Sequence, residues 1–161
     1  MSIEERIAEG LSTRLGTAIK RAEQALMAEK TRVLKPFGLS VPQYAALHAL
    51  SVAPLTGAQM ARVCCVTPQS MASLLTTLES KNLVDRSPSE VHSLVRVAQL
   101  TRAGRALFAE ADAAALAVEA RLSSAYTAEE EGLTRELLQR SVNALTSPAT
   151  PVSLPPTPVA H

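Results

Sequence analysis

The sequence predicts a mostly α-helical fold with one small β-hairpin. Apolar residues recur at steps of three and four over most of the chain, which is the spacing of one buried helix face. Between residues 83 and 100 the pattern changes to one typical of two short strands around a turn. Of the 161 residues, 47% are apolar and 19% are charged, so the composition is that of a globular chain with a core.

The first predicted element is a long helix from Ile3 to about Val33. Pro36 and Gly38 follow it and are expected to end it, because Pro cannot continue a helix and Gly readily adopts the left-handed conformation. One face of this helix is apolar: Ile7, Leu11, Leu15, Ala18, Ile19, Ala22 and Leu26.

Three shorter helices are predicted next, each after a residue that caps a helix N-terminus. Two begin with a hydroxyl residue followed three positions later by Gln, at Ser40–Gln43 and Thr56–Gln59. Thr67 caps the third helix, and Pro68 occupies its first position. The third helix carries one apolar stripe, made of Met71, Leu74, Leu75 and Leu78. Its other face is small, uncharged and able to form hydrogen bonds: Gln69, Ser70, Ser73, Thr76 and Thr77.

A hairpin and two further helices complete the predicted order. Leu83–Val84 and Leu94–Leu100 are expected to be strands, with a turn at Ser87–Glu90. Helices follow from Ala103 to Tyr126, after a Thr101 cap, and from a capping box at Thr127–Glu130 through Leu145. Five of the last fifteen residues, 147–161, are Pro, which predicts a disordered tail.

Short helices followed by a two-stranded hairpin are typical of a winged helix-turn-helix, here expected over residues 39–102. The flanking segments 1–38 and 103–146 are too long and too apolar to be solvated singly. They are therefore expected to pair with a second copy in a two-fold dimer. An intramolecular helix bundle is the alternative.

Composition excludes several classes of protein. The net charge is +1 and only 2% of residues are aromatic, which disfavours bulk polyanion binders and base-stacking modules. The adjacent Cys64 and Cys65 rule out a disulfide framework and fit a reducing cytoplasm. No membrane span or export signal is expected. Without a phosphate loop, nucleophile elbow or metal-ligand spacing, the chain is not expected to be an enzyme or to hold a cofactor.

The charge is unevenly distributed. Residues 51–105 carry six bases and three acids, whereas residues 106–161 carry three bases and seven acids. Any polyanion is therefore expected to meet the middle of the chain, although an ordinary solvated surface would have the same balance.

Five stretches occur in an order and spacing that resembles the MarR family of bacterial transcription regulators over residues 39–104, and the flanking helices extend the likeness to about residue 145. The stretches are Gly38–Tyr44, Leu55–Ala61, Val66–Met71, Leu78–Arg86 and Leu100–Gly104. The resemblance implies a homodimer that binds a pseudo-palindromic operator in double-stranded DNA. It also implies release by a small, commonly aromatic, acid or by an oxidant.

The chain departs from the family pattern at the wing. The family's wing tip carries Asp-x-Arg-Arg or a close variant, whereas His92, Ser93 and Leu94 stand here. No Lys or Arg occurs between Val63 and Ser80. Because neutralisation of phosphates supplies much of DNA affinity, bases flanking the recognition helix must do this work. The candidates are Arg62, Lys81, Arg86 and Arg96.

The expected DNA-binding residues lie on the recognition helix and around the hairpin. Gln69 can pair with adenine, Ser70 and Ser73 with several bases, and Thr67 and Pro68 leave backbone N–H groups for a phosphate. Arg86 is expected either on DNA or on an acid of the wing. The complete set is Thr67, Pro68, Gln69, Ser70, Ser73, Thr77, Arg62, Arg86, His92 and Arg96. Exposed polar residues without a ligand are the plain alternative.

Two further pairs are candidate sensors. Tyr44 and His48, four residues apart on one helix face, are expected to hold the carboxylate or hydroxyl of a small effector, or else to be packed structural residues. Cys64 is expected in the core, whereas Cys65 is expected to be exposed and open to oxidation. A zinc site with His48 and His92 is disfavoured, because adjacent helical residues diverge.

The sequence thus favours a ligand-responsive repressor or activator. The alternative is a winged-helix interaction module that binds DNA weakly or not at all, and the absent wing arginines favour that alternative.

Overall fold

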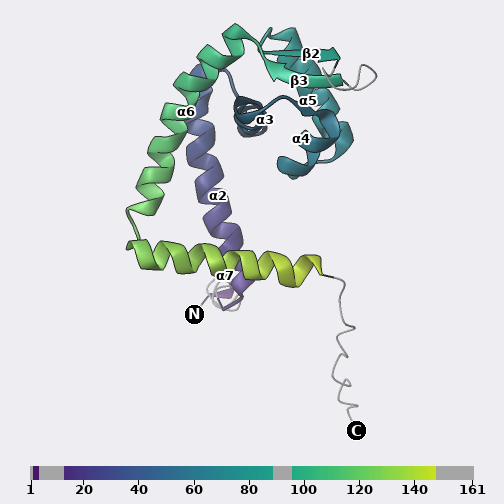
Figure 1. Ribbon diagram of the computed structural model, residues 1–161. Helices are drawn as coiled ribbons and strands as arrows, with labels where there is room; N and C mark the ends of the chain where they lie inside the picture. Colours follow the sequence, from purple (N-terminus) through teal and green to yellow (C-terminus); the bar gives the residue numbers. More distant parts are fainter. Residues whose placement is uncertain (1, 4–12, 89–95, 148–161) are drawn as a thin grey trace. The chain divides into compact units, whose positions relative to one another are not determined.

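The computed structural model describes residues 2–3, 13–88 and 96–147 (Figure 1). The chain divides into two compact units, Met1–Glu119 and Ala120–His161. The expectations for His92, Ser93 and Leu94, for the start of the first helix and for the Pro-rich tail fall outside the described residues.

The first described helix is α2, Leu15–Leu34, and it ends where the sequence predicted. The prediction of one continuous helix from Ile3 was wrong, because Arg14 has an extended backbone (φ −88°, ψ 124°) and α2 begins after it. A short 3-10 turn, η1 (Lys35–Phe37), contains Pro36 and leads into Gly38. Gly38 has a φ of 64°, the left-handed conformation that glycine adopts without steric cost. The chain can therefore turn sharply from α2 into the next helix.

The three shorter helices are α3 (Val41–Val52), α4 (Gly57–Val63) and α5 (Pro68–Ser80). Both predicted capping boxes and the Thr67 cap are confirmed. The caps satisfy backbone N–H groups that have no partner within the helix. The local sequence therefore sets where each helix starts.

The first strand of the hairpin is longer than predicted. Strand β2 (Val84–Pro88) pairs antiparallel with β3 (Arg96–Leu100), from Val84 opposite Leu100 to Pro88 opposite Arg96. Ser87 and Pro88 were expected in a turn, and this was wrong. Because β2 is an edge strand, Pro88 can sit at its end without breaking an interior ladder. A third strand, β1 (Leu55–Thr56), pairs with the other side of β3 and was not predicted.

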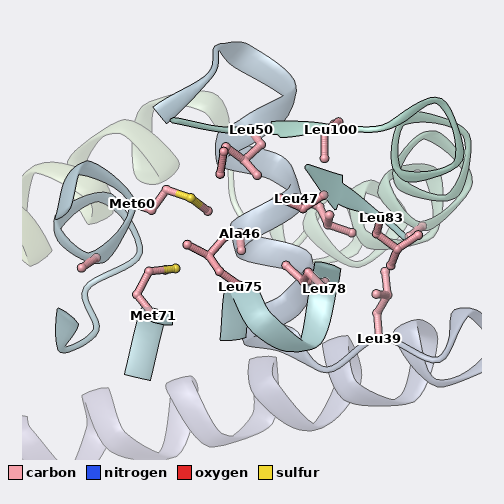
Figure 2. Packing of buried hydrophobic residues seen from close by; sticks show 14 of the residues in the cluster. Leu39, Ala46, Leu47, Leu50, Met60, Met71, Leu75, Leu78, Leu83 and Leu100 are labelled. Carbon is pink, nitrogen blue, oxygen red and sulfur yellow. The ribbon is translucent and has the colours of Figure 1, made fainter. Parts of the chain in front are cut away.

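The core of the first unit lies between α3, α5 and the sheet. Met71, Leu75 and Leu78 from the predicted α5 stripe are buried, and Leu74 is half-buried. Figure 2 shows Met60, Met71 and Leu75 converging beside Ala46 of α3. The helix order and the hairpin confirm the predicted winged helix-turn-helix, with the polar side of α5 facing outward.

Helix α6 (Arg102–Ser123) starts after the predicted Thr101 cap, whose hydroxyl accepts from the Gly104 N–H at 2.9 Å. The helix ends three residues before the predicted Tyr126. Gly104 is buried against the backbone of Leu83, where a Cβ atom would overlap the Leu83 carbonyl oxygen. This contact holds the start of α6 close to the chain entering β2.

The second unit contains α7 (Ala128–Thr146). The predicted capping box of Thr127 and Glu130 is confirmed, and three Glu residues in the first turn complement the helix dipole. Within the described chain no residue of α7 is buried. Five large apolar side chains are exposed: Leu133, Leu137, Leu138, Val142 and Leu145. None of the described helices is long and apolar enough to cross a membrane.

Candidate nucleic-acid interface

The outward face of α5 forms one wall of an open groove of about 520 Å³. The N-terminal turn of α3 forms the other wall. The lining residues are Ser40, Pro42 and Gln43 from α3, with Gln69, Ser70, Ser73, Leu74 and Thr77 from α5. The structure thus gathers four predicted DNA-binding residues in one groove. The α3 residues were missed, because nothing in the local sequence connects the start of α3 with α5, which lies beyond α4 in the chain.

Hydrogen bonds separate the polar side chains of α5 into two groups. Thr67 Oγ1 donates to Ser70 Oγ at 2.8 Å, and Thr77 Oγ1 donates to the Ser73 carbonyl at 3.0 Å. The side chains of Gln69 and Ser73 are exposed and have no hydrogen-bond partner within the described chain. These two side chains therefore keep their donors and acceptors for a ligand.

The backbone at the start of α5 has fewer free N–H groups for a phosphate than the sequence predicted. Pro68 has no N–H, and the Ser70 N–H already donates to Thr67 Oγ1 at 3.1 Å. Within the first turn, the Gln69 N–H remains for a phosphate. The anion-binding capacity of this helix start is correspondingly small.

Positive charge flanks the groove, whose lining residues are all uncharged. Arg62 is exposed in the last turn of α4. Arg96 is exposed at the start of β3, and its guanidinium donates to the Arg86 carbonyl at 2.6 Å. Lys81 donates to the Gly38 carbonyl at 2.9 Å. Among the described residues, Arg62, Lys81 and Arg96 are thus the predicted bases that are not paired with a side chain, and Lys81 and Arg96 each donate to a backbone carbonyl.

Arg86 was expected either on DNA or on an acid of the wing. It has a carboxylate partner, but this partner is Glu79 of α5. The Arg86 guanidinium donates from Nε to Oε1 of Glu79 at 2.8 Å and from a second nitrogen to Oε2. The hydrogen bond from Arg86 holds the pKa of the Glu79 carboxyl below its ordinary value. The pair therefore links the C-terminal end of α5 to β2.

Tyr44 and His48 lie in an aromatic cluster with Phe108 of α6. The ring centroids are 6.1 Å apart for Tyr44–His48, 6.0 Å for Tyr44–Phe108 and 5.8 Å for His48–Phe108. The Tyr44 hydroxyl donates to Asp112 Oδ1 at 2.7 Å. Burial and this carboxylate raise the pKa of the hydroxyl. His48 is exposed, so it is not the core histidine that the structural alternative assumed.

Cys64 and Cys65 lie in the turn between α4 and α5. Cys64 is half-buried against the core and Cys65 is exposed, as the sequence predicted. Burial raises the pKa of the Cys64 thiol. Cys65 has a φ of 54°, and the next N–H, of Val66, donates back to the Ala61 carbonyl at 3.0 Å. Among the described residues, no group of three or more His, Cys, Asp or Glu side chains is arranged to hold a metal.

Comparison with known proteins places this geometry among DNA-binding regulators. The model of the MarR family matches residues 37–93. A Mycobacterium tuberculosis protein called HTH-type transcriptional repressor Rv2887 is 35% identical over 127 residues, which cover 78% of this chain and 91% of that protein.

Two crystal structures of Rv2887 match the described fold. In one, Rv2887 is in complex with p-aminosalicylic acid, and the match has a TM-score of 0.63 at 34% identity and covers 81% of this chain and 99% of the other. In the second, Rv2887 is in complex with DNA, with the same TM-score and identity and coverage of 80% and 98%.

Proposed function

The chain belongs to the MarR family of transcriptional regulators, and on that premise we propose that two copies together bind one pseudo-palindromic DNA operator. The outward face of α5 carries this proposal. In helix-turn-helix proteins the second helix of the motif enters the major groove. Gln69 and Ser73 present unengaged polar groups there, in a groove that is open to solvent.

The phosphate contacts are assigned to Arg62 and Arg96. Both are exposed, Arg62 in the last turn of α4, before α5 in the chain, and Arg96 at the start of β3, after it. Phosphate contacts fix the register of a protein on DNA, whereas base contacts specify sequence. A dimer doubles the number of such cations, which compensates for their scarcity in one copy.

Dimerisation is assigned to the terminal helices, residues 1–38 and 103–146. The exposed apolar side chains of α7 support this proposal, because an apolar stripe of that length is costly to leave in water. The full chain is therefore expected to sediment as a dimer at micromolar concentration, and Leu137→Glu to shift it toward the monomer. A wild-type monomer would overturn this part of the proposal.

The effector site is assigned to the aromatic cluster of Tyr44, His48 and Phe108. Its stacked rings suit a flat aromatic molecule, and the related Rv2887 has been crystallised with p-aminosalicylic acid. The Tyr44 hydroxyl already donates a hydrogen bond to Asp112, so His48 is the better donor for an acidic ligand. Titration of p-aminosalicylic acid should release DNA from the wild type and not from His48→Ala.

An oxidant is the second proposed trigger, through Cys65. Its thiol is exposed in the turn that leads into the recognition helix. Oxidation there would alter the packing between α4 and α5. Hydrogen peroxide should weaken DNA binding by the wild type and leave Cys65→Ser unaffected.

The proposed function is tested by a gel shift of the full chain with the DNA that flanks its own gene, at two salt concentrations. A scrambled duplex of the same composition is the control. Specific binding that weakens with salt supports the proposal.

The second candidate function is an interaction module without tight DNA binding, favoured by the uncharged lining of the groove. Equal, weak binding of both duplexes by a folded dimer would support this second candidate instead.

A further inference from the structure

We propose that the operator positions facing α5 are adenine–thymine base pairs, because this helix presents groups that read A·T and lacks those that select guanine or cytosine. The inference rests on the proposed function and deepens it, since it names the class of DNA sequence that the same groove takes.

Guanine is most often recognised through its O6 and N7 atoms, which accept hydrogen bonds from an Arg guanidinium or a Lys ammonium group. Helix α5 contains neither residue type from Pro68 to Ser80. The guanidinium of Arg86, on the adjoining strand, donates from Nε and from one terminal nitrogen to Glu79, so its two-point fork is already occupied. Helix α5 therefore has no cationic side chain that could select guanine in the major groove.

The same ion pair engages the one carboxylate of α5 that could recognise cytosine. A carboxylate can accept from the cytosine N4 amino group, and Glu79 is the only acid within α5. Its two oxygens accept from Arg86, and it lies near the C-terminal end of the helix rather than in the groove. This one ion pair thus engages both the acid of α5 and the Arg of the adjoining strand.

Adenine has a matching reader in Gln69. A side-chain amide carries one donor and one acceptor, which pair with the N7 and N6 atoms of adenine. The Gln69 amide lines the groove and is exposed, without a hydrogen-bond partner within the described chain. Ser73 follows one turn later on the same wall of the groove, and its hydroxyl can form a hydrogen bond with adenine as well as with other bases.

Thymine has a matching surface in Thr77. The Thr77 hydroxyl donates its proton to the Ser73 carbonyl at 3.0 Å, so its γ-methyl is the group left for an apolar contact. The C5-methyl group of thymine is the apolar feature of the major groove. Gln69, Ser73 and Thr77 are spaced by four residues and share one wall of the groove.

The first test is a selection of tightly bound duplexes from a random 20-base-pair DNA pool by the full chain. The expected result is two symmetric segments of A·T pairs at the positions protected by α5. Recovery of a specific sequence with G·C pairs at those positions overturns the inference and keeps the proposed function. Recovery of no sequence overturns both.

The second test changes single atoms in the selected duplex. Replacing adenine by 7-deazaadenine removes N7, and replacing thymine by uracil removes the methyl group. Each change should weaken binding by the wild type about 5- to 100-fold at a contacted position. Gln69→Ala should be insensitive to the 7-deazaadenine change, whereas the matched control Gln24→Ala, exposed on α2, should respond like the wild type. Equal sensitivity of Gln69→Ala and wild type overturns the inference.

Discussion

The guanidinium of Arg86 on β2 and the carboxylate of Glu79 on α5 form a two-point ion pair that joins the recognition helix to the wing strand. Bidentate pairing restricts orientation as well as distance. The contact therefore restricts the angle between α5 and the hairpin. It also pairs the two charged groups with each other rather than with DNA. Arg96 extends the connection, because its guanidinium donates to the backbone carbonyl of Arg86.

Glu79→Gln should destabilise the fold in a pH-dependent way. Because the pKa of Glu79 is lowered below 4.5, its contribution is complete above about pH 4.5 and is lost as the pH falls through the lowered value. Both partners are about one third exposed, so the expected loss at pH 7 is about 1 kcal/mol or less. Urea unfolding at pH 7 and pH 3 measures it. Glu23→Gln, in a more exposed pair with Lys20, is the control. A loss that is equally large at both pH values would contradict this interpretation.

Gly104→Ala should destabilise the fold by several times the effect of an ordinary surface change. An added Cβ would overlap the carbonyl oxygen of Leu83, and backbone cannot move aside as a flexible side chain can. Overpacking of this kind costs about 1–3 kcal/mol or more. Gly132→Ala is the matched control, since nothing lies within 4 Å of its added Cβ and Ala favours a helix over Gly. Thermal unfolding of both variants checks the prediction, which is wrong if the two changes have the same sign.

Cys65→Gly should stabilise the fold. Cys65 adopts a φ of 54°, which costs a residue with a Cβ about 1–2 kcal/mol, and Gly would remove that cost at the end of α4. The net gain is smaller, because Gly also gives more freedom to the unfolded chain. Asn82→Gly is the control: Asn82 has a φ of 56°, but Asn tolerates this conformation. Denaturant midpoints should rise for Cys65→Gly and change little for Asn82→Gly. A lower midpoint for Cys65→Gly would contradict the strain argument.

Arg96→Ala should weaken binding to all DNA sequences alike. Removal of one or two phosphate contacts per dimer lowers the slope of log affinity against log salt by about 1–2 units. The control is Arg32→Ala, since Arg32 pairs with Glu29 within α2. Fluorescence anisotropy over a salt series measures the slope. An unchanged slope would mean that the wing strand does not touch DNA, and the interaction module would then be the better interpretation.

Local sequence determined much of this fold. The caps at Ser40, Thr56, Thr67 and Thr127 depend on residues at most three positions apart, so their geometry could be predicted from the sequence. The stripe on α5 likewise identified its buried face.

Contacts distant in sequence could not be predicted in the same way. Strand β1 is two residues long, too short to show alternation, and its pairing with β3 spans about forty residues. The bond between Tyr44 and Asp112 joins residues 68 positions apart. The Arg86 partner was missed because Glu79 belongs to another element, and the α3 wall of the groove was missed for the same reason. Tertiary packing decides these contacts, and it leaves no local pattern.

Sequence-specific DNA binding through α5 is tested most directly by comparing the affinity of wild type and Gln69→Ala for the selected duplex and for a scrambled one across a salt series. The wild type should prefer the selected duplex by about 1,000-fold or more. Gln69→Ala should lose about 5- to 100-fold of that preference and keep the same salt slope, because Gln69 carries no charge. Equal affinity of the wild type for both duplexes, or an unchanged preference in Gln69→Ala, would contradict sequence-specific binding through α5.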